Sequence, residues 1–490
     1  MYNKKLFNPK TNHGKRNILN ALVNNGFHKM EPKMCRVPHF FYRMVYFMKL
    51  PRLLILIFWA SQAQQDSLVE THFIKDAYLE GEVRNFFMNT NNLNDSDDYF
   101  TNATGLQLKL NSGTWNNISL GAGGRYITKT FSSPIAEVDT QTENFTKWEF
   151  ELYDILNRDN FNLFFLEELY LNYQAKNWNL QVGNMLARDT PLFSRSDGRM
   201  RPFHYRGAWL DYSENPTHQF SVAWLTHVLP RSTSAWFSIN ESIGLLSNGF
   251  QPDGSQADYK GMYNSKGAGI LSYQYRKNNI EFSAHQFLIH DMMYTSFLEA
   301  HYYWNQWSLG AQYAIQKGTA SNKRLDYINR YIQPDETPQV LSLQLTYAKP
   351  TYSFGLAYSY ALPTGRMLFP KELGREWFFT STARSRTEGL GDMHGIVVRA
   401  NYFAPQQPFS LHAEIIQMLG MKMGNYRFNK YNIDEYYQVN LRLRYSLNAL
   451  KGLKFDVLYT FKQNYNENDP INVFNRSDYG QLNFVTLLYF

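Results

Sequence analysis

Apolar and polar side chains alternate along the last ten residues of the chain. The residues of one parity, most of them apolar, are Leu482, Phe484, Thr486, Leu488 and Phe490. The other parity begins with Asn483 and then becomes mixed. A strand with lipid on one face and a watery lumen on the other needs this pattern. The pattern recurs along almost the whole chain, which is therefore predicted to be all-β and to form a transmembrane antiparallel β-barrel.

Pairs of alternating runs separated by short polar turns predict β-hairpins. Five pairs are clear: 169–173 with 178–182, 271–275 with 280–284, 298–302 with 307–313, 341–347 with 354–360, and 439–445 with 453–461. Aromatic rings cluster beside these turns, as expected of a girdle at the membrane interface. They are Tyr173, Trp178, Tyr302, Trp307, Tyr347, Tyr445 and Phe490.

Longer polar stretches lie between the hairpins and predict external loops. They are 88–102, 130–159, 186–203, 229–265, 291–295, 317–337, 362–393, 420–434 and 464–479. Nine such connections, all long except 291–295, alternate with eight short ones, which predicts about 18 strands. Both ends of the barrel then lie in the periplasm, with long external loops and short periplasmic turns.

The first 63 residues differ from the rest. Met48 to Arg52 is basic, 53–59 is apolar, and Ser61-Gln62-Ala63 offers small residues, which predicts a secretory signal cleaved after Ala63. We interpret residues 1–47 as an over-extended gene start, with a genuine cytoplasmic extension as the alternative. The single barrel domain is predicted to span 64–490.

Removing this segment changes the charge of the protein. Residues 1–63 hold 11 Lys and Arg and one acidic residue, Glu31, so the remainder keeps 38 of the 49 basic and 41 of the 42 acidic residues. The net charge changes from +7 to about −3, and the sequence gives no reason to expect nucleic acid binding. Cys35, the single cysteine, lies in the same segment, so no disulfide or thiol chemistry is expected.

Bulk composition agrees with a barrel. Aromatic residues make up 17% of the chain and the mean hydropathy is −0.47. Beyond residue 63 there is no run of 18 apolar residues that would predict a spanning helix. A closed barrel is the remaining way to span lipid, because backbone groups in hydrocarbon need internal partners.

Several short motifs resemble the OprD family of outer-membrane porins, in a Bacteroidetes-like branch. They are 78–87 (YLEGEVRNFF), 166–173 (LEELYLNY), 180–184 (LQVGN), 190–193 (TPLF), 197–202 (DGRMRP) and 206–207 (RG). The resemblance covers roughly residues 76–210. It implies a monomeric channel or a loose homotrimer that passes amino acids, peptides or small carboxylates. It also implies that Phe490 is the signal read by the barrel-assembly machinery.

Parity places a set of basic residues on the lumen side: Arg84, Lys109, Arg125, Arg276, Arg399, Arg442 and Arg444. Charged side chains at mid-membrane on the lipid face would cost about 2–4 kcal/mol each. A basic ladder along one wall, which the family resemblance implies, would guide anions through the pore. The alternative is a mixed lining, since parity also turns acidic residues inward: Glu80, Glu82, Glu168, Glu281, Glu299 and Asp456.

The third long connection is predicted to fold into the lumen and to form a constriction that selects solutes. Its charged residues are Arg188, Asp189, Arg195, Asp197, Arg199 and Arg201. Guanidinium groups bind carboxylates in a bidentate manner. The alternative is a solvated loop stabilised by its own Arg–Asp pairs. A second inserting loop could be 362–393, with Arg366, Lys371, Arg375, Arg384 and Arg386.

Other functional classes find less support. Asp95-Ser96-Asp97-Asp98 lacks the ordered spacing of a calcium loop, and His285, His290 and Asp291 have no nucleophile or third ligand at a helpful spacing. No cofactor or metal is expected. A porin that admits small hydrophilic solutes is therefore the leading hypothesis. The alternatives are a plugged barrel acting in adhesion or as a scaffold, and an outer-membrane enzyme such as a lipase.

Overall fold

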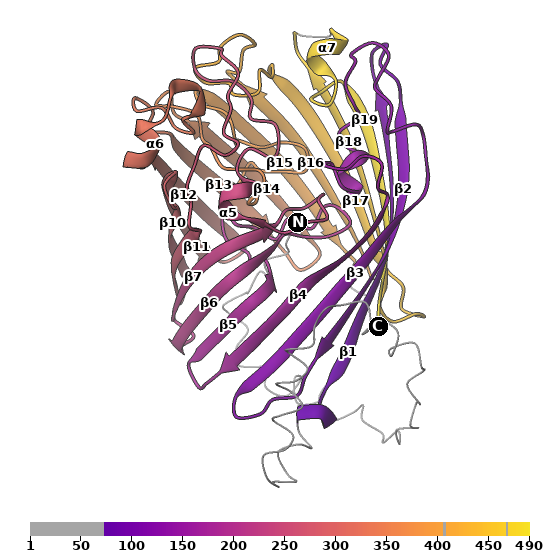
Figure 1. Ribbon diagram of the computed structural model, residues 1–490, viewed down its shortest axis with the longest axis vertical. Coiled ribbons are helices and arrows are strands. Elements are labelled where there is room, and N and C mark those ends of the chain that lie inside the picture. The colour runs from indigo at the N-terminus through magenta and orange to yellow at the C-terminus, as the bar shows by residue number, and fades with distance from the viewer. Residues whose placement is uncertain (1–72, 405–407, 467–468) are drawn as a thin grey trace. The chain divides into compact units, whose positions relative to one another are not determined.

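The chain forms a closed antiparallel β-barrel, shown in the computed structural model of Figure 1. The structure describes residues 73–404, 408–466 and 469–490. It divides into two units, Met1–Asp76 and Ala77–Phe490, and the second unit is the barrel. The expected signal segment and Cys35 lie outside the described residues, so the cleavage site and the domain boundaries stay predictions.

Eighteen long strands make the wall, and the predicted fold class and strand number are confirmed. The strands are β1 (Tyr78–Asn92), β2 (Tyr99–Asn111), β3 (Ile118–Ser132), β4 (Asn162–Gln174), β5 (Trp178–Leu186), β6 (His204–Asn215), β7 (His218–Leu229), β9 (Ala268–Lys277), β10 (Ile280–Ile289), β11 (Met293–Trp304), β12 (Trp307–Gly318), β13 (Gln339–Ala348), β14 (Tyr352–Ala361), β15 (Met393–Phe403), β16 (Phe409–Leu419), β17 (Tyr436–Ser446), β18 (Leu453–Asn464) and β19 (Tyr479–Tyr489). A two-residue strand, β8 (Phe237–Ser238), pairs only with the end of β7. Neighbouring strands in the sequence pair with each other, β7 pairs with β9, and β1 pairs with β19.

Closure of the barrel ends on the last residue of the chain. Gly81 donates its N–H to the carbonyl oxygen of Phe490 at 2.8 Å, and Phe490 donates back to Gly81 at 3.1 Å. The Phe490 ring lies over Gly81, where an added Cβ would be 2.2 Å from the ring. A side chain at this point of the β1–β19 seam would displace the Phe490 ring, which covers the gap that the glycine leaves.

The two faces of the wall follow the alternation of the sequence. Outward apolar side chains are exposed, for example Leu343 at 52% and Leu356 at 51%. Aromatic rings pair beside the short turns: Trp178 lies 4.3 Å from Tyr212 between ring centroids. The wall therefore offers lipid an apolar band with an aromatic girdle at the end that carries the short turns.

Five short helical segments lie in the long connections: η1 (Phe150–Leu152), α5 (Ile239–Ser242), α6 (Ala320–Arg324), η2 (Tyr327–Asn329) and α7 (Pro470–Val473). None of the helices among the described residues is long and apolar enough to cross a membrane.

Two of the nine predicted external loops are short. The connection predicted at 88–102 is reduced to 93–98, because β1 continues to Asn92 and β2 begins at Tyr99. The connection predicted at 291–295 spans only 290–292. Polar residues at the end of β1 are held in the strand by their own bonds: Asn91 donates to Asp98 at 2.8 Å. Their polarity marks a strand that extends beyond the apolar band, not a loop.

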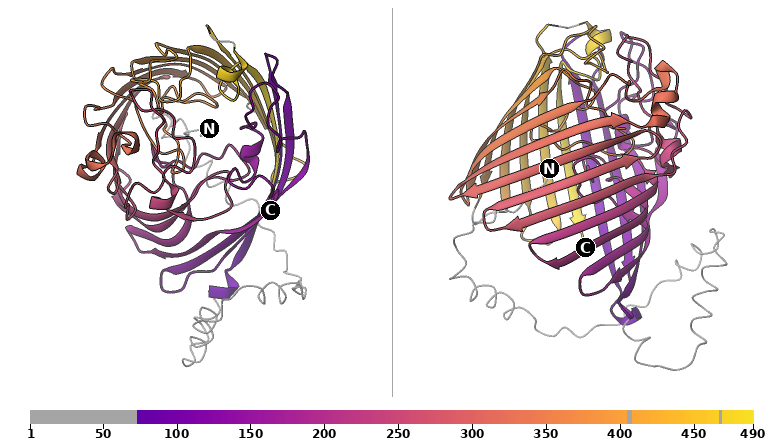
Figure 2. Two further views of the ribbon diagram at one scale, coloured as in Figure 1. Left: turned by 45° about the horizontal axis from the view of Figure 1, so that its top comes forward. Right: turned by 90° about the vertical axis from the view of Figure 1, so that its left-hand side faces the viewer.

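The longest connections turn inward and pack against the inner wall, as the view from the loop end shows (Figure 2). Phe193 of connection 187–203 lies 5.1 Å from Phe369 of connection 362–392 and 5.8 Å from Phe287 of β10. These rings belong to a large apolar cluster that includes residues from both loops and the wall. The lumen at the loop end is thus narrowed by packed protein.

Candidate pore constriction

Connections 187–203 and 362–392 meet inside the barrel. The Ser194 hydroxyl donates to the Arg375 carbonyl oxygen at 2.9 Å, and the Tyr205 hydroxyl donates to the Leu373 carbonyl oxygen. The backbones approach so closely at Gly374 that an added Cβ would lie 2.4 Å from the Leu192 carbonyl oxygen. These contacts hold the two loops together inside the barrel, with Tyr205 contributing from β6. That the loops form a solute-selecting constriction stays a prediction.

Ion pairs hold connection 187–203 against the inner wall. Asp197 accepts from the Arg84 guanidinium at 2.6 and 3.0 Å, and Arg84 also donates to the Arg199 carbonyl oxygen at 2.6 Å. Arg188 forms an ion pair with Asp211 of β6. Asp197 and Arg188 therefore form their ion pairs with strand residues. The alternative prediction, a solvated loop, expected Arg–Asp pairs within the loop itself.

The other charged residues of this connection have different surroundings. The Arg201 guanidinium donates to four backbone carbonyl oxygens, those of Pro202, Leu229, Pro230 and Thr233, at 2.5–3.3 Å. Asp189 is exposed and Arg195 is half-buried. Arg201 thus ties loop backbones together, while the solute-selecting role expected of all six residues stays a prediction.

The residues of the expected basic ladder point inward, and each has an acidic partner. Arg84 and Arg125 are 3% and 2% exposed and share Glu82, at 3.1 and 2.8 Å. The remaining pairs are Arg125–Glu167 (3.0 Å), Lys109–Glu168 (2.9 Å), Arg276–Glu281 (3.7 Å), Arg399–Glu414 (3.0 Å), Arg444–Asp456 (3.2 Å) and Arg442–Asp456. The strands therefore contribute paired charges, and guidance of a solute by the ladder stays a prediction.

Glu167 was not among the residues expected inside, and a β-bulge explains why it is there. The β3–β4 register shifts between Gly123 and Gly124, so Glu167 is the extra residue. Glu167 and Glu168 are consequently both buried, although they are adjacent in the sequence. Strict alternation assigns only one of two neighbours to the lumen, so the sequence pattern alone misses Glu167.

Connection 362–392 carries the second group of cations. Arg366 is fully buried and donates to Glu336 at 3.0 Å and to the Phe250 carbonyl oxygen at 2.7 Å, which joins three loops. Lys371 lies 3.6 Å from Glu388. Arg386 donates to the Glu376 carbonyl oxygen at 2.8 Å. Arg366 is thus structural, whereas Lys371 and Arg386 are half-buried.

A surplus of positive charge gathers around one carboxylate, Glu151 of η1. We name this set the Glu151 cluster: Glu151, Lys147, Arg199, Arg231, Arg375 and Arg384. Arg199 Nε lies 2.9 Å from Glu151, and Arg231 lies 4.0 Å from it. Four loops supply these residues. Lys147, Arg375 and Arg384 interact with Glu151 electrostatically, and Arg384 also interacts with Glu149.

The electrostatics of the cluster follow from this imbalance. Burial opposes ionisation of Glu151, but Arg199, Lys147, Arg231 and Arg375 outweigh it and hold the pKa of Glu151 well below its ordinary value. Burial and the like charge of Arg199 also lower the pKa of Arg231. Glu151 is thus a carboxylate at physiological pH. Burial lowers the pKa of Lys147 to about 8 and that of Arg384 to about 9, so part of the positive charge of the cluster depends on pH.

Three members of the cluster were missed by sequence reasoning. Lys147, Glu151 and Arg231 lie in stretches that were assigned to external loops. No periodic pattern marks a loop that folds inward, so their approach to Arg199 is a product of tertiary structure.

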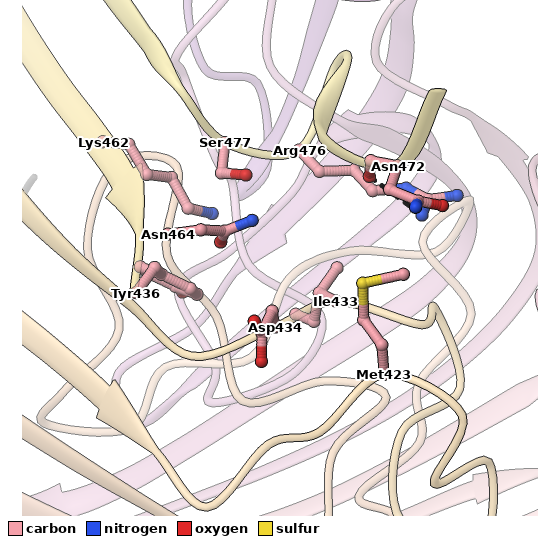
Figure 3. Close-up of a pocket in the computed structure, with 9 residues that line it drawn as sticks. All are labelled: Met423, Ile433, Asp434, Tyr436, Lys462, Asn464, Asn472, Arg476 and Ser477. Atoms are coloured by element: carbon pink, nitrogen blue, oxygen red, sulfur yellow. Dashed lines mark hydrogen bonds between the residues drawn. The ribbon is translucent and has the colours of Figure 1, made fainter. Parts of the chain in front are cut away.

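A small cavity lies between connections 420–435 and 465–478 (Figure 3). Lys462, Tyr436 and Asp434 are among the residues that line it. Its volume is about 10 Å³, which suits a single water molecule rather than a solute. No group of three or more His, Cys, Asp or Glu side chains suited to a metal ion occurs in the part of the chain that the structure describes.

Comparisons with known proteins place the fold. No protein-family model matches the chain, and no curated protein sequence matches it significantly. The barrel is similar to the crystal structure of OccK9 (OpdG) from Pseudomonas aeruginosa, with a TM-score of 0.66, 15% identity and coverage of 85% of this chain and 99% of that one. It is also similar to the crystal structure of OccAB4 from Acinetobacter baumannii, with a TM-score of 0.62, 14% identity and coverage of 84% of this chain and 98% of that one.

A third similar structure is Pseudomonas aeruginosa OpdK with vanillate, with a TM-score of 0.61, 15% identity and coverage of 85% and 99%. OpdK is described as an outer-membrane protein. The predicted resemblance to OprD-family porins is confirmed at the level of the fold, an outer-membrane barrel architecture. The Bacteroidetes-like branch stays a prediction.

Proposed function

We propose that this barrel is an outer-membrane porin that lets small hydrophilic anions diffuse through its lumen. The observation that carries the proposal is the Glu151 cluster, in which Arg199 and Arg231 lie 2.9 and 4.0 Å from one carboxylate and Lys147, Arg375 and Arg384 interact with it electrostatically. Charged rings in a narrow pore select ions of opposite sign, because the low dielectric of the wall strengthens their field. Vanillate, the compound in the OpdK crystal structure, is an aromatic carboxylate and belongs to the same chemical class.

Planar bilayers test this proposal with the purified full-length protein. We expect stepwise conductance and, in asymmetric KCl, a reversal potential of the sign that chloride permeation gives. A cation-selective current would contradict the assignment of anions. A correctly folded protein without any conductance would favour the plugged adhesion or scaffold barrel instead.

Phe490 has a second proposed role as the signal for the barrel-assembly machinery. The ring is 60% exposed at the terminus of the closing strand, where another protein can reach it. Deleting Phe490 should lower the amount of barrel inserted in cells. The conductance of the molecules that do insert should remain the same. Unchanged surface levels would contradict this role.

A further inference from the structure

The wall of the barrel is parted between β4 and β5. Register pairs between these strands run only from Leu169↔Asn184 to Gln174↔Asn179. Residues 162–168 of β4 pair with β3 alone, and Met185 and Leu186 of β5 pair with β6 alone. The β4 edge next to the parting is therefore free of strand partners over half of its length. Unpaired backbone groups facing lipid are costly, so such an edge needs a cover.

Three backbone irregularities surround the parting. Gly183 of β5 lies next to the Leu169↔Asn184 pair, where the parting begins. It has φ +126°, and an added Cβ there would lie 2.3 Å from the Leu169 carbonyl oxygen. Glu167 is the extra residue of the bulge in β4. Thr226 is the extra residue of a second bulge, because Arg206 pairs with His227 and Gly207 with Leu225. Bulges and strained glycines at one place in a wall mark a built feature.

The parting lies at the level of the apolar band. Phe164 of β4 is 63% exposed beside it. Leu169, Asn184 and Arg206 share one register row, and Leu169 is exposed on the lipid side, so Arg206 also faces outward. A guanidinium on the lipid face is unusual, and the Arg206 guanidinium lies next to the parting.

The first residues of connection 230–267 cover the parting, and we name residues 230–236 the strap. The strap bonds to connection 133–161: Ile155 donates its N–H to the Ser232 carbonyl oxygen at 3.1 Å, and Ser234 donates to Asp154 at 3.2 Å. At its end, the Trp236 indole N–H donates to the Leu166 carbonyl oxygen on the free edge of β4, at 3.1 Å.

Trp236 is the residue that joins the two sides of the parting. Across from Leu166, the Arg206 guanidinium lies 5.2 Å from the Trp236 ring and donates to Asn184 at 2.7 Å. The indole thus takes the place of a strand partner between β4 and β6. One indole hydrogen bond is weaker than a ladder of backbone bonds, so the β4 edge itself is held less firmly than a paired strand edge. The strap is anchored on the lumen side by Arg201, which donates to the Pro230 and Thr233 carbonyl oxygens.

The lumen side of the parting is both apolar and cationic. A second cavity of about 10 Å³ lies behind it, and its lining includes Leu163, Ile127, Met200, Arg199, Arg201 and Thr233. The Arg201 guanidinium lies 4.9 Å from the Phe165 ring. Guanidinium groups and apolar side chains thus lie next to each other behind the parting, and in the closed state the space between them holds no more than a water molecule.

We propose that the parting between β4 and β5 is a lateral passage from the lumen into the outer leaflet for amphipathic anions, and that the strap closes it through the Trp236 side chain. The lumen cations receive the charged head, and lipid receives the apolar tail as the strap moves aside. The choice of anions rests on the proposed function, whereas the passage itself rests on the parted strands and their cover.

A reversible lock tests the passage. Ile155→Cys and Ser232→Cys in the full chain would join the strap to connection 133–161, because an N–H···O bond of 3.1 Å already brings the backbones of these two residues together. Proteoliposomes would be given a pyrene-labelled long-chain carboxylate, the matching pyrene-labelled ammonium, or acetate. We expect the oxidised lock to abolish protein-dependent transfer of the carboxylate probe into the bilayer, reduction to restore it, and acetate flux to stay unchanged.

A second variant acts in the opposite direction. Trp236→Ala removes the indole that closes the passage and should raise carboxylate-probe transfer about tenfold. A shift of about 1.4 kcal/mol in the equilibrium between the closed and open states gives this change. Trp224→Ala is the matched control, since Trp224 is an outward tryptophan of β7 at 40% exposure outside the strap.

The outcomes separate the two parts of the proposal. If neither the disulfide nor Trp236→Ala changes carboxylate transfer, the lateral passage is refuted. This conclusion does not depend on the ion selectivity of the pore. A lock that stops the ammonium probe as strongly as the carboxylate overturns the solute class, and it does so independently of the reversal potential measured in KCl.

Discussion

Replacing Arg375 with Gln tests the charge of the constriction most directly. The Arg375 guanidinium donates to the carbonyl oxygens of Lys371 and Gly374 at 2.6 and 2.8 Å. Glutamine keeps a donor for these bonds and removes one positive charge from the Glu151 cluster. The Ser194 bond is made to the Arg375 backbone carbonyl, so the contact between the two constriction loops does not depend on the side chain.

The magnitude follows from Coulomb's law. A permeating anion that passes about 4 Å from a unit charge gains about 1 kcal/mol in bulk water and about 4 kcal/mol at an effective dielectric constant of about 20. Because the permeating anion is in water, we expect the lower figure, about 1 kcal/mol. Its loss corresponds to about a fivefold fall in the chloride-to-potassium permeability ratio. Salt screens the effect, because the Debye length falls from about 10 Å at 0.1 M to about 3 Å at 1 M.

The assay is the reversal potential of single channels in asymmetric KCl at low and at high ionic strength. Lys176→Gln is the control, because it removes one positive charge from an exposed position in the turn 175–177, outside the constriction. A permeability ratio that changes no more in Arg375→Gln than in Lys176→Gln would refute the assignment of ion selectivity to this cluster.

Three further predictions concern closure, pH and the constriction loop. Gly81→Val should displace the Phe490 ring and lower the unfolding temperature as much as Phe490→Ala does, and the double variant should add little, because both remove the same contact; additive losses in thermal melts would contradict a shared contact. Burial lowers the pKa of Lys430 from 10.5 to about 7, so the unfolded loop binds more protons between these values and the folded loops gain stability as pH rises. Hydrogen exchange near Lys430, corrected for intrinsic rates, should slow by up to about tenfold per pH unit above 7, and Lys430→Met should remove this dependence. Deleting residues 188–201 should raise conductance; reduced or unchanged conductance in a folded barrel would contradict a constriction there.

The alternation of residues was sufficient to predict the wall. Each strand has one parity that faces lipid, as at Leu341, Leu343 and Leu345, and the physical penalty for a charge on that face makes the pattern strict. The strand number followed from the same periodicity. The pattern became unreliable where it was interrupted, as at the Glu167 bulge, and where polar residues continue a strand beyond the lipid, as in β1.

The charged residues show the limit of such reasoning. Parity placed Arg84 and Arg125 in the lumen, but their sharing of Glu82 depends on strand register and on the rotamers that packing selects. The approach of Arg199 to Glu151 depends on two loops that fold inward, for which the sequence has no repeating pattern. Local propensity describes single segments, whereas a contact between two loops is a property of the packed whole.

The sequence by itself determined that this protein is a barrel, how many strands it has and which face of each strand meets lipid. These features come from a repeat of two residues that the backbone imposes on every strand. Only the tertiary structure decided which loops fold inward, which cations approach Glu151, and that β4 and β5 part beside Trp236. Such contacts join residues far apart in the chain, and their energies depend on burial and distance that exist only after the barrel has closed.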